Sequence, residues 1–491
     1  MHTNRSRRRI PALLRGLTLA ALLLLVALPV GNVGAASDNA QGAISVLVKS
    51  KVPLTPDVVA MISSHAAQVS YVWPEIDAMA LKVTPSQMGD LVMDPVVAVV
   101  EPNLQGQAIS DDSALPEELI SPPSTIVPIF TSSDPIETWN LSMAETNGTA
   151  YDGTGVTVAV VDSGLPQNWG DFLPPGSVDT THAAGFGAEG WGDFHNPVNA
   201  VRGVGGHIGL FPHGLAVSSV IVGFPSDFGP VGGAAPGATI LPIRVLNQFN
   251  SGWFSWFTAA FLHVANLKAN GDLTGPVVIN FSIQARGNSQ VLTDAIDYAI
   301  SQDIVFVTIA GNFGPSSDTI SFPGRLPQSI TAGATGWTQE GSSAAWFCDP
   351  VPPDDPTQVY VATFSGREAS PPLSLSLIDV LAPGSFVYGE WLGGPGFSEG
   401  RQVAFDDISN FIFGTSFASP HVAGIAAQML EKNPNLTQAQ TESILRSTAL
   451  AIPPSPGVTF TPLSFVAPWG ANATGSGLAR GSAAVAATPT P

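Results

Sequence analysis

Apolar residues recur with two different periods along residues 43–100. Where the period is two, alternating side chains predict a strand with one buried face, and where it is about 3.6 they predict an amphipathic helix. The expected order is strand, helix, strand, strand, helix and strand, over residues 43–48, 56–66, 68–73, 78–83, 85–92 and 96–100. This order is that of a small α+β (ferredoxin-like) split βαβ domain, a fold that by itself indicates no function.

From about residue 139 onward, short continuous apolar runs are followed by helical stretches. The runs are rich in β-branched residues, and such runs between helices are typical of parallel strands buried on both faces. The sequence therefore predicts an α/β domain with a parallel sheet and helices on both of its faces. Strands are expected over 156–161, 240–245, 277–282 and 304–309, a long helix over about 415–431, and loop insertions over about 341–360 and 388–410.

The first 36 residues have the organisation of an export signal. Arginines precede the apolar run of residues 17–30, and small residues follow it at 34–36. The run is short for a membrane span, and no second apolar stretch of the sequence replaces it. We therefore expect a secreted, extracellular protein of bacterial type, without a stable membrane span after signal cleavage. An uncleaved anchor is the alternative, and the export route, general or twin-arginine, stays open.

Residues from about 105 to 134 are rich in proline, serine and acids without periodicity, which is typical of a linker. Together with the patterns above, this composition predicts four segments. They are a signal over 1–36, a small domain over 37–104, a linker or lead-in over 105–138, and a large domain over 139–491.

The composition favours a large folded protein and argues against nucleic acid as a partner. Hydrophobic residues make up 44% of the 491 residues and charged residues only 11%, so the chain can bury a large interior. The net charge of -20 becomes -25 when the signal, with its five arginines and no acids, is removed. A surface this acidic repels phosphate backbones. Cys348 is the only cysteine, so no disulfide can form within the chain.

Two candidate catalytic side chains lie at the start or end of a predicted element. Asp162 follows the apolar run 156–161, so a carboxylate stands at the sheet edge where the active sites of such folds collect. A carboxylate there can orient an imidazole. His213 begins a stretch of small and branched residues at helical spacing. Taken singly, Asp162 could cap a turn, and His213 could be a helix-start histidine that backbone groups satisfy.

Two further segments supply an amide and a hydroxyl. Asn312 follows the predicted strand 304–309, and its side chain can donate to a developing oxyanion; a plain turn asparagine is the alternative. Ser416 follows a tight, glycine-led turn at Gly414 and begins an alanine-rich helix, a location that exposes its Oγ. The segment 414–427 is a long sequence motif, so it identifies this kind of site far more specifically than the short motifs around the other three residues.

Taken in this order, the four segments resemble the subtilisin-like serine peptidases (subtilases) over nearly all of residues 139–487. The connecting stretches 233–238 and 379–384 are also similar to that family. Residues 43–101 resemble the inhibitory propeptide that such enzymes carry. The resemblance implies a secreted serine endopeptidase, made as a precursor, that acts on protein or peptide substrates and binds its own propeptide.

The resemblance also implies a role for each residue. Ser416 is implied to be the nucleophile and His213 its general base and acid. Asp162 is implied to orient the histidine, and Asn312 to donate to the oxyanion. No cofactor is required for this chemistry, and the propeptide is expected to be cut near residues 103–112. The implied substrate-binding residues are Ser282, Ile283 and Gln284, which pair with substrate backbone, and Ile309, Ala310 and Gly311, which flank the specificity pocket.

The sequence departs from the family pattern at two places. The family usually has His-Gly-Thr-His at the base, whereas Leu215 and Ala216 follow His213 and Gly214 here. Gln284 stands where glycine is usual, and its side chain is expected to narrow the substrate groove. The altered residues after His213 leave an alternative: a catalytically inactive relative that serves as a binding or surface module. An esterase with a nucleophile elbow is disfavoured, because it needs Gly-x-Ser-x-Gly and has its serine first in chain order.

A metal site is conceivable in one glycine-rich stretch but is not favoured. The histidines and acids there fit no known metal spacing, so a surface loop explains them better. The sequence contains no zinc motif of the His-Glu-x-x-His type and no phosphate-binding loop. The residues concerned are His182, His195, His207, Asp179 and Asp193.

Two other groups of residues are assigned to structure. The acidic pairs 354–355 and 406–407 lack a loop of alternating oxygen ligands, so a structural calcium ion, although possible, stays unassigned. The aromatic residues of 253–257 precede a helical stretch and are expected in the core, with a rim that touches substrate as the alternative.

Overall fold

The computed structural model describes residues 42–108, 134–166, 168–187, 213–226, 229–247, 249–339, 351–352, 354–370, 376–390, 409–457 and 466–491. The predicted signal, most of the predicted linker and much of the two predicted insertions lie outside these residues. Within them, no helix has both the length and the apolar character that a membrane span needs.

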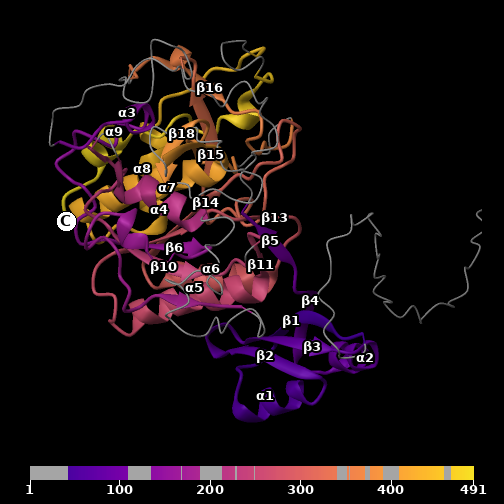
Figure 1. Cartoon of the computed structure of the whole chain (residues 1–491). Coiled ribbons are helices and arrows are strands. Elements are labelled where there is room, and N and C mark those ends of the chain that lie inside the picture. Colours follow the sequence, from indigo (N-terminus) through magenta and orange to yellow (C-terminus); the bar gives the residue numbers. More distant parts are fainter. Residues whose placement is uncertain are drawn as a thin grey trace, which may run out of the picture. The chain divides into compact units, whose positions relative to one another are not determined.

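Residues 44–102 form a four-stranded antiparallel sheet with two helices (Figure 1). The strand order is β2-β3-β1-β4. Thr84 and Gln87 form a capping box at the start of α2, so the helix begins where the sequence places its cap. The elements are β1 (Ile44–Ser50), α1 (Pro56–Ser63), β2 (Gln68–Trp73), β3 (Ala78–Val83), α2 (Pro85–Met93) and β4 (Val97–Pro102).

Among the described residues, the large sheet has eight strands in the order β16-β15-β14-β12-β6-β10-β7, with β17 paired to β15. All neighbouring strands are parallel except β16, which runs antiparallel to β15. The strands are β6 (Thr157–Asp162), β7 (Ala184–Gly185), β10 (Thr239–Arg244), β12 (Val277–Phe281), β14 (Ile304–Ile309), β15 (Ile330–Trp337), β16 (Val359–Val361) and β17 (Val380–Pro383).

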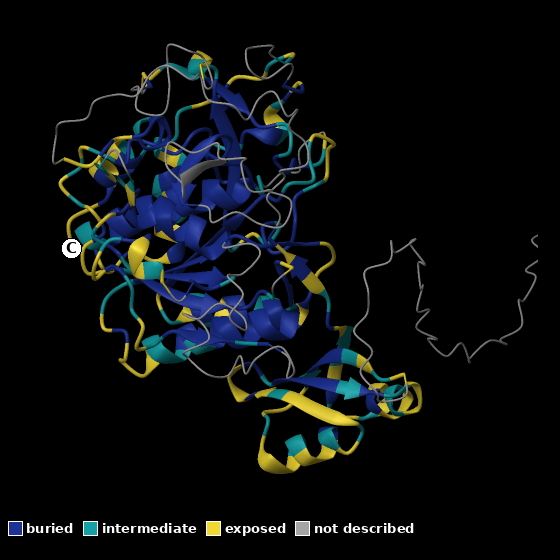
Figure 2. Cartoon of the chain, in the orientation of Figure 1, coloured by how far each residue is buried: buried dark blue, intermediate teal, exposed yellow. Residues whose placement is uncertain are grey.

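Helices cover both faces of this sheet, which confirms the predicted α/β class. Along β6, Val158 and Val160 join an apolar cluster with α4 and α7, whereas Ala159 and Val161 join a cluster with α5 and α6. The residues of both sets are buried, and β6 has the colour of buried residues in Figure 2, which explains why the strand is continuously apolar. The helices are α3 (Trp139–Met143), α4 (His213–Val222), α5 (Phe254–Ala269), α6 (Gln290–Ser301), α7 (Thr415–Lys432), α8 (Gln438–Thr448) and α9 (Gly481–Ala487).

Several short strands were not expected from the sequence. Residues 105–107, at the start of the predicted linker, form a strand that pairs with two partners on the large domain. The ends of the second predicted insertion also pair with each other. Strands of two to four residues are too short to produce a recognisable apolar period. The additional strands are β5 (Gln105–Gln107), β8 (Phe224–Ser226), β9 (Gly229–Val231), β11 (Ser251–Trp253), β13 (Gln284–Ala285), β18 (Val387–Glu390) and β19 (Ser409–Ile412).

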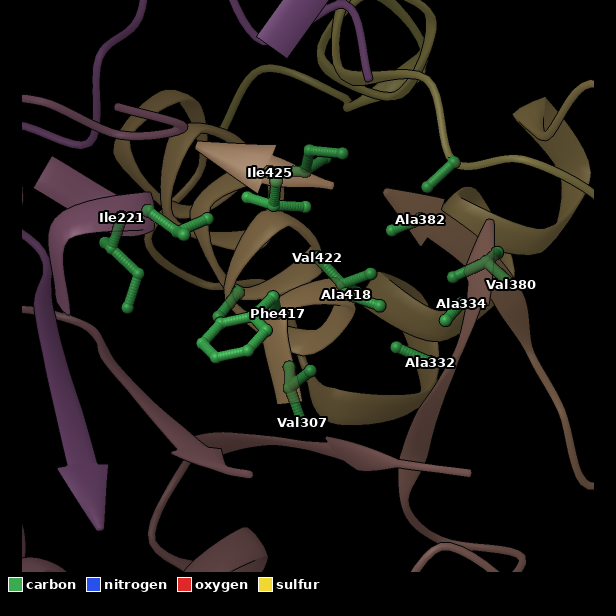
Figure 3. Close-up of a cluster of buried hydrophobic side chains, with 14 of the residues drawn as sticks. Ile221, Val307, Ala332, Ala334, Val380, Ala382, Phe417, Ala418, Val422 and Ile425 are labelled. Atoms are coloured by element: carbon green, nitrogen blue, oxygen red, sulfur yellow. The ribbon is translucent and has the colours of Figure 1, made fainter. Parts of the chain in front are cut away.

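Helix α7 is the central buried helix of the large domain. Its residues 415–430 are all buried, and Phe417, Val422 and Ile425 lie among side chains of α4 and the neighbouring strands (Figure 3). Gly424 lets the helix approach the turn at Ala234, because a Cβ atom there would lie 2.5 Å from Ala234 Cβ. Small residues along α7 therefore set how closely it packs.

A buried histidine ties α7 to the start of the large domain. His421 Nδ1 donates to the carbonyl oxygen of Phe417 (2.7 Å), and Asn140 Nδ2 donates to His421 Nε2 (2.9 Å). The bond that Nε2 accepts needs the neutral imidazole, because a protonated Nε2 has no free lone pair, whereas Nδ1 can donate in either state. Burial lowers the pKa of His421 to about 4, although the bond to the Phe417 carbonyl acts in the opposite direction.

Replacing Gly424 by alanine should destabilise the large domain. The added methyl group would meet Ala234, so the expected loss in free energy of unfolding is about 1–3 kcal/mol. Urea unfolding followed by circular dichroism measures it, in a Ser416→Ala background that removes the implied peptidase activity. The control is Gly89→Ala in α2, where no atom lies within 4 Å of the new Cβ, and this change should stabilise slightly. Equal effects of the two changes would contradict the packing argument.

The His421 network should make stability depend on pH below neutrality. The pKa of this histidine is lower in the folded protein than in the unfolded chain, so its contribution is complete above about pH 6.5 and is lost as the pH falls toward 4. The gap in unfolding free energy between the parent and His421→Gln should therefore narrow by up to about 3 kcal/mol over that window. Parallel pH profiles for the two proteins would argue against a buried neutral histidine.

Candidate active site

Asp162 and His213 form a buried pair at the edge of the large sheet. Asp162 is the last residue of β6, and His213 is the first residue of α4. His213 Nδ1 donates to the carboxylate and lies 2.9 Å from both of its oxygens. Both side chains are fully buried, and Oδ1 also accepts from the backbone N–H of Ser163 (2.6 Å). The carboxylate thus fixes the ring orientation and leaves Nε2 directed away from it.

Two glycines allow this close approach. Gly164 has a φ of +75°, which turns the chain away directly after Asp162 and Ser163. A Cβ atom at Gly214 would lie 2.6 Å from the carbonyl oxygen of Gly164, so only glycine fits after the histidine. Gly214 N also donates to Ser163 Oγ (2.9 Å), which links the start of the helix to the end of the strand.

The residues that depart from the family pattern after His213 are part of the core. Leu215 and Ala216 are both fully buried in the apolar cluster between α4 and α7. An apolar leucine is therefore accommodated without an unpaired polar group. The departure changes packing behind the histidine and leaves the Asp162–His213 pair intact.

Ser416 is the second residue of α7, immediately after the turn at Gly414. Gly414 has a φ of +135°, a conformation that favours glycine. Ser416 Oγ donates to the carbonyl oxygen of Ser282 (3.3 Å), and Ser282 Oγ donates to the carbonyl oxygen of Ser416 (2.9 Å). The helix start is therefore held on the segment that follows β12.

The histidine and the serine come from packed, neighbouring helices. The ring of His213 lies 5.5 Å from the ring of Phe417, the residue after Ser416. His213 Nε2 is buried and has no hydrogen-bond partner among the described residues. Ser416 Oγ is bonded to Ser282 instead, so the structure contains the Asp–His bond and no Ser–His bond. Catalytic hydrogen bonds are often absent or long before substrate binds.

Asn312 lies beside the start of α7. Its Oδ1 accepts from Thr415 N (2.9 Å) and from Thr415 Oγ1 (2.8 Å), so its side-chain NH2 group faces the opposite way. Thr415 was not singled out in the sequence, although it lies inside the specific segment 414–427. The backbone N–H of Asn312 donates to Gln284 Oε1 (2.6 Å). Thr415 thus fixes the Asn312 side chain through its backbone N–H and its hydroxyl, and the Gln284 side chain fixes the Asn312 backbone.

The six expected substrate-binding residues fall into two adjoining segments. Ser282 and Ile283 connect β12 to β13, which Gln284 begins, and all three are buried. Ile309 ends β14, and Ala310 and Gly311 lead to Asn312. A Cβ atom at Gly311 would lie 3.2 Å from Gln284 Oε1, so the glutamine side chain contacts the second segment.

A strand from the N-terminal part lies between β11 and β13. β5 pairs antiparallel with both, giving a three-stranded sheet in the order β11-β5-β13. Ala108 N adds a bond to the carbonyl oxygen of Asn250 (3.0 Å), and Phe254 N donates to the carbonyl oxygen of Leu104 (2.9 Å). The edges of β11 and β13 can therefore hold an extended peptide through backbone hydrogen bonds.

The same N-terminal segment caps two helices of the large domain. Glu101 accepts from Ser289 Oγ and from Gln290 N (2.9 Å) at the start of α6. Asn103 Oδ1 accepts from Ser255 N (2.9 Å) in the first turn of α5. Unpaired N–H groups at helix starts favour such acceptors, and the negative charge of Glu101 adds to the effect.

The histidine-rich stretch gives no support for a metal site. His182 Nδ1 pairs with Asp179 (2.6 Å), whereas His195, His207 and Asp193 lie outside the described residues. Within the described part of the chain, no group of three or more His, Cys, Asp or Glu side chains is arranged to hold a metal ion.

Comparisons with known proteins match this architecture. Residues 153–479 match the family model described as "Subtilase family". Subtilisin amylosacchariticus from Bacillus subtilis subsp. amylosacchariticus is 26% identical over 391 residues, which cover 79% of this chain and 80% of that protein. Subtilisin from Bacillus pumilus is 29% identical over 301 residues, or 61% of this chain and 85% of the relative.

A solved structure shows the same fold. Fervidolysin from Fervidobacterium pennivorans, described as a keratinolytic enzyme related to subtilisin, superposes with a TM-score of 0.61 at 22% identity. The match covers 93% of this chain and 63% of fervidolysin, so this chain spans less than two thirds of that protein. The family model alone covers well over half of this chain. The chain therefore belongs to the subtilase family of serine peptidases.

Proposed function

We propose that this protein is a secreted serine endopeptidase that cuts peptide bonds with Ser416, His213 and Asp162. The supporting observation is the buried Asp162–His213 bond beside the helix that carries Ser416. His213 Nε2, without a partner among the described residues, is the atom that would take the Ser416 proton. A buried imidazole nitrogen without a hydrogen-bond partner costs free energy, and a hydroxyl that moves toward it during the reaction would supply that partner.

In the proposed mechanism, a substrate strand pairs with β11 and β13 and brings its carbonyl carbon to Ser416. Oγ turns from the Ser282 carbonyl toward His213 Nε2, gives up its proton and attacks. Asn312 Nδ2 and the backbone N–H of Ser416 donate to the oxyanion. His213 then protonates the leaving amine, and the acyl-enzyme is hydrolysed by a water activated in the same way. Asp162 holds the ring and stabilises its protonated form throughout.

The chain is proposed to be made as a precursor. The segment 37–104 would be an inhibitory propeptide, because β5 directly after it fills the groove that a substrate strand would use. Cleavage by the enzyme itself is proposed near residues 103–112, after export directed by residues 1–36. Glu101 and Asn103 would hold the propeptide on the two helix starts until then. The proposed chemistry uses no cofactor, and a structural calcium ion stays unassigned.

A catalytically inactive binding module is the second candidate. The altered residues at 215 and 216 and the bond from Ser416 Oγ to the Ser282 carbonyl favour it. It requires the same fold but no reactive serine, so the two candidates differ in a single measurable property.

Labelling by a fluorophosphonate probe separates the candidates. The full chain should react at Ser416 and convert itself to a shorter form, whereas Ser416→Ala should stay unlabelled and full length. Peptide hydrolysis should fall by about 10⁴-fold or more. Ser447→Ala, which removes an exposed hydroxyl of α8, should behave as the parent does. An unlabelled parent chain with no self-cleavage would favour the binding module.

Gln284 should position the oxyanion donor in the proposed mechanism. Gln284→Met keeps the side-chain volume but removes the acceptor for the backbone N–H of Asn312. Losing one such bond should lower kcat by about tenfold with a smaller effect on KM. Steady-state kinetics on a peptide substrate measures both constants, and Gln284→Glu, which keeps an acceptor, tests recovery. An unchanged kcat in Gln284→Met would show that the bond has no catalytic consequence.

A further inference from the structure

Gly106 is the central residue of the strand that lies between β11 and β13. It pairs with Gly252 on one side and with Ala285 on the other. A Cβ atom at position 106 would lie 2.9 Å from Phe257 Cε2, 3.1 Å from Ile283 Cγ2 and 3.2 Å from the Gln284 carbonyl oxygen. The first of these distances is closer than van der Waals contact allows, so a side chain here meets an occupied space.

The backbone of Gly106 does not itself require glycine. Its φ is not among the positive values found at other glycines of the chain, and it belongs to a regular antiparallel pair. Any residue could adopt this conformation. The restriction at this position therefore comes from its surroundings, and chiefly from the Phe257 ring.

The Phe257 ring has little freedom to move aside. It is 1% exposed, and it packs against the rings of Phe254 (6.0 Å between centroids) and Phe281 (5.2 Å). On the side of β11, a Cβ atom at Gly252 would lie 2.7 Å from Phe257 Cε1. One ring thus fills the space in front of two glycines, and the dense core behind it resists displacement.

The strand register gives the place of this position relative to the proposed reaction. Gln107 pairs with Gln284, and Gly106 pairs with Ala285. Each step forward along one antiparallel strand is a step backward along the other. Continuing this register two residues beyond β13 puts the third residue after the Gly106 position in a bound chain opposite Ser282, whose carbonyl oxygen accepts from Ser416 Oγ. If the bond after that residue is cut, Gly106 marks the fourth residue on its amino-terminal side.

We propose that Phe257 makes the groove selective for glycine at the fourth residue before the cleaved bond. The inference rests on the proposed peptidase function and names its substrate class: extended peptides with glycine at that position. In the proposed self-cleavage, the chain itself is the substrate, and Gly106 is the glycine at that position. An alanine there must displace a buried ring, and a leucine would need the whole volume that the ring occupies.

The test compares three peptides that differ only at this position, with glycine, alanine or leucine, on the processed enzyme. The parent should cleave the glycine peptide at least about tenfold more efficiently, in kcat/KM, than the alanine peptide, and the leucine peptide more slowly still. In Phe257→Ala, the vacated space should reduce the preference for glycine and raise cleavage of the leucine peptide. Equal kcat/KM for all three peptides on the parent would overturn the inference.

Two further measurements keep the outcomes distinct. Phe261→Ala removes a ring one turn further along α5, packed on Phe281 and Phe306, and should weaken the fold without changing peptide preference. Phe257→Leu, a milder change, replaces Phe257→Ala if that variant does not fold. Fluorophosphonate labelling of every sample separates the two hypotheses. A parent that labels but shows no glycine preference contradicts only this inference, whereas a parent that does not label contradicts the proposed function itself.

Discussion

The bond between Asp162 and His213 is the constraint on which the rest of the site depends. A carboxylate and an imidazole that are both fully buried are tolerable only when they pair closely, because either side chain alone would lose its hydration without compensation. The two residues are 51 positions apart in the chain. They meet because a parallel strand ends and a helix begins at the same sheet edge, and because Gly164 and Gly214 let the two backbones touch. The sheet topology and the two glycines together make this one hydrogen bond possible.

The strands β11 and β13, in contrast, are held to the N-terminal part by backbone hydrogen bonds and not by a buried ion pair. β11 and β13 present strand edges that need partners, and β5 supplies them in this chain. Its neighbours Glu101 and Asn103 supply acceptors to the unpaired N–H groups of α6 and α5. The same few residues therefore satisfy one sheet edge and two helix starts. Such an arrangement suits the proposed propeptide, which would bind firmly until it is cleaved and would then free the edges of β11 and β13.

The elements that could be predicted from the sequence are those whose apolar pattern directly reflects how they are buried in the fold. β6 is continuously apolar because both of its faces are buried, so its run and the terminal Asp162 were recognisable. The specific segment around Ser416 was recognisable for a similar reason, since a buried helix that packs closely needs small residues throughout. β5 was not predicted, because its pairing comes from strand edges more than 140 residues away and its Gln-Gly-Gln sequence has no apolar period. The contact from Gln284 to Asn312 was also missed, since a glutamine in a strand does not reveal where its side chain points.

Some residues of this chain affect both the packing of the core and the shape of the proposed substrate groove. Leu215 stands as a buried apolar residue where the family pattern has a polar one, and Gln284 stands in place of a glycine with a side chain that accepts from Asn312 N. Phe257 belongs to both the core and the groove, because one side of its ring packs on Phe281 and another faces Gly106. A substitution that opens the groove at Phe257 must therefore leave a cavity in the core, with the loss of stability that cavities bring. Selectivity at this position is coupled to stability, so a broader groove that keeps the stability of the domain requires compensating changes in the ring cluster.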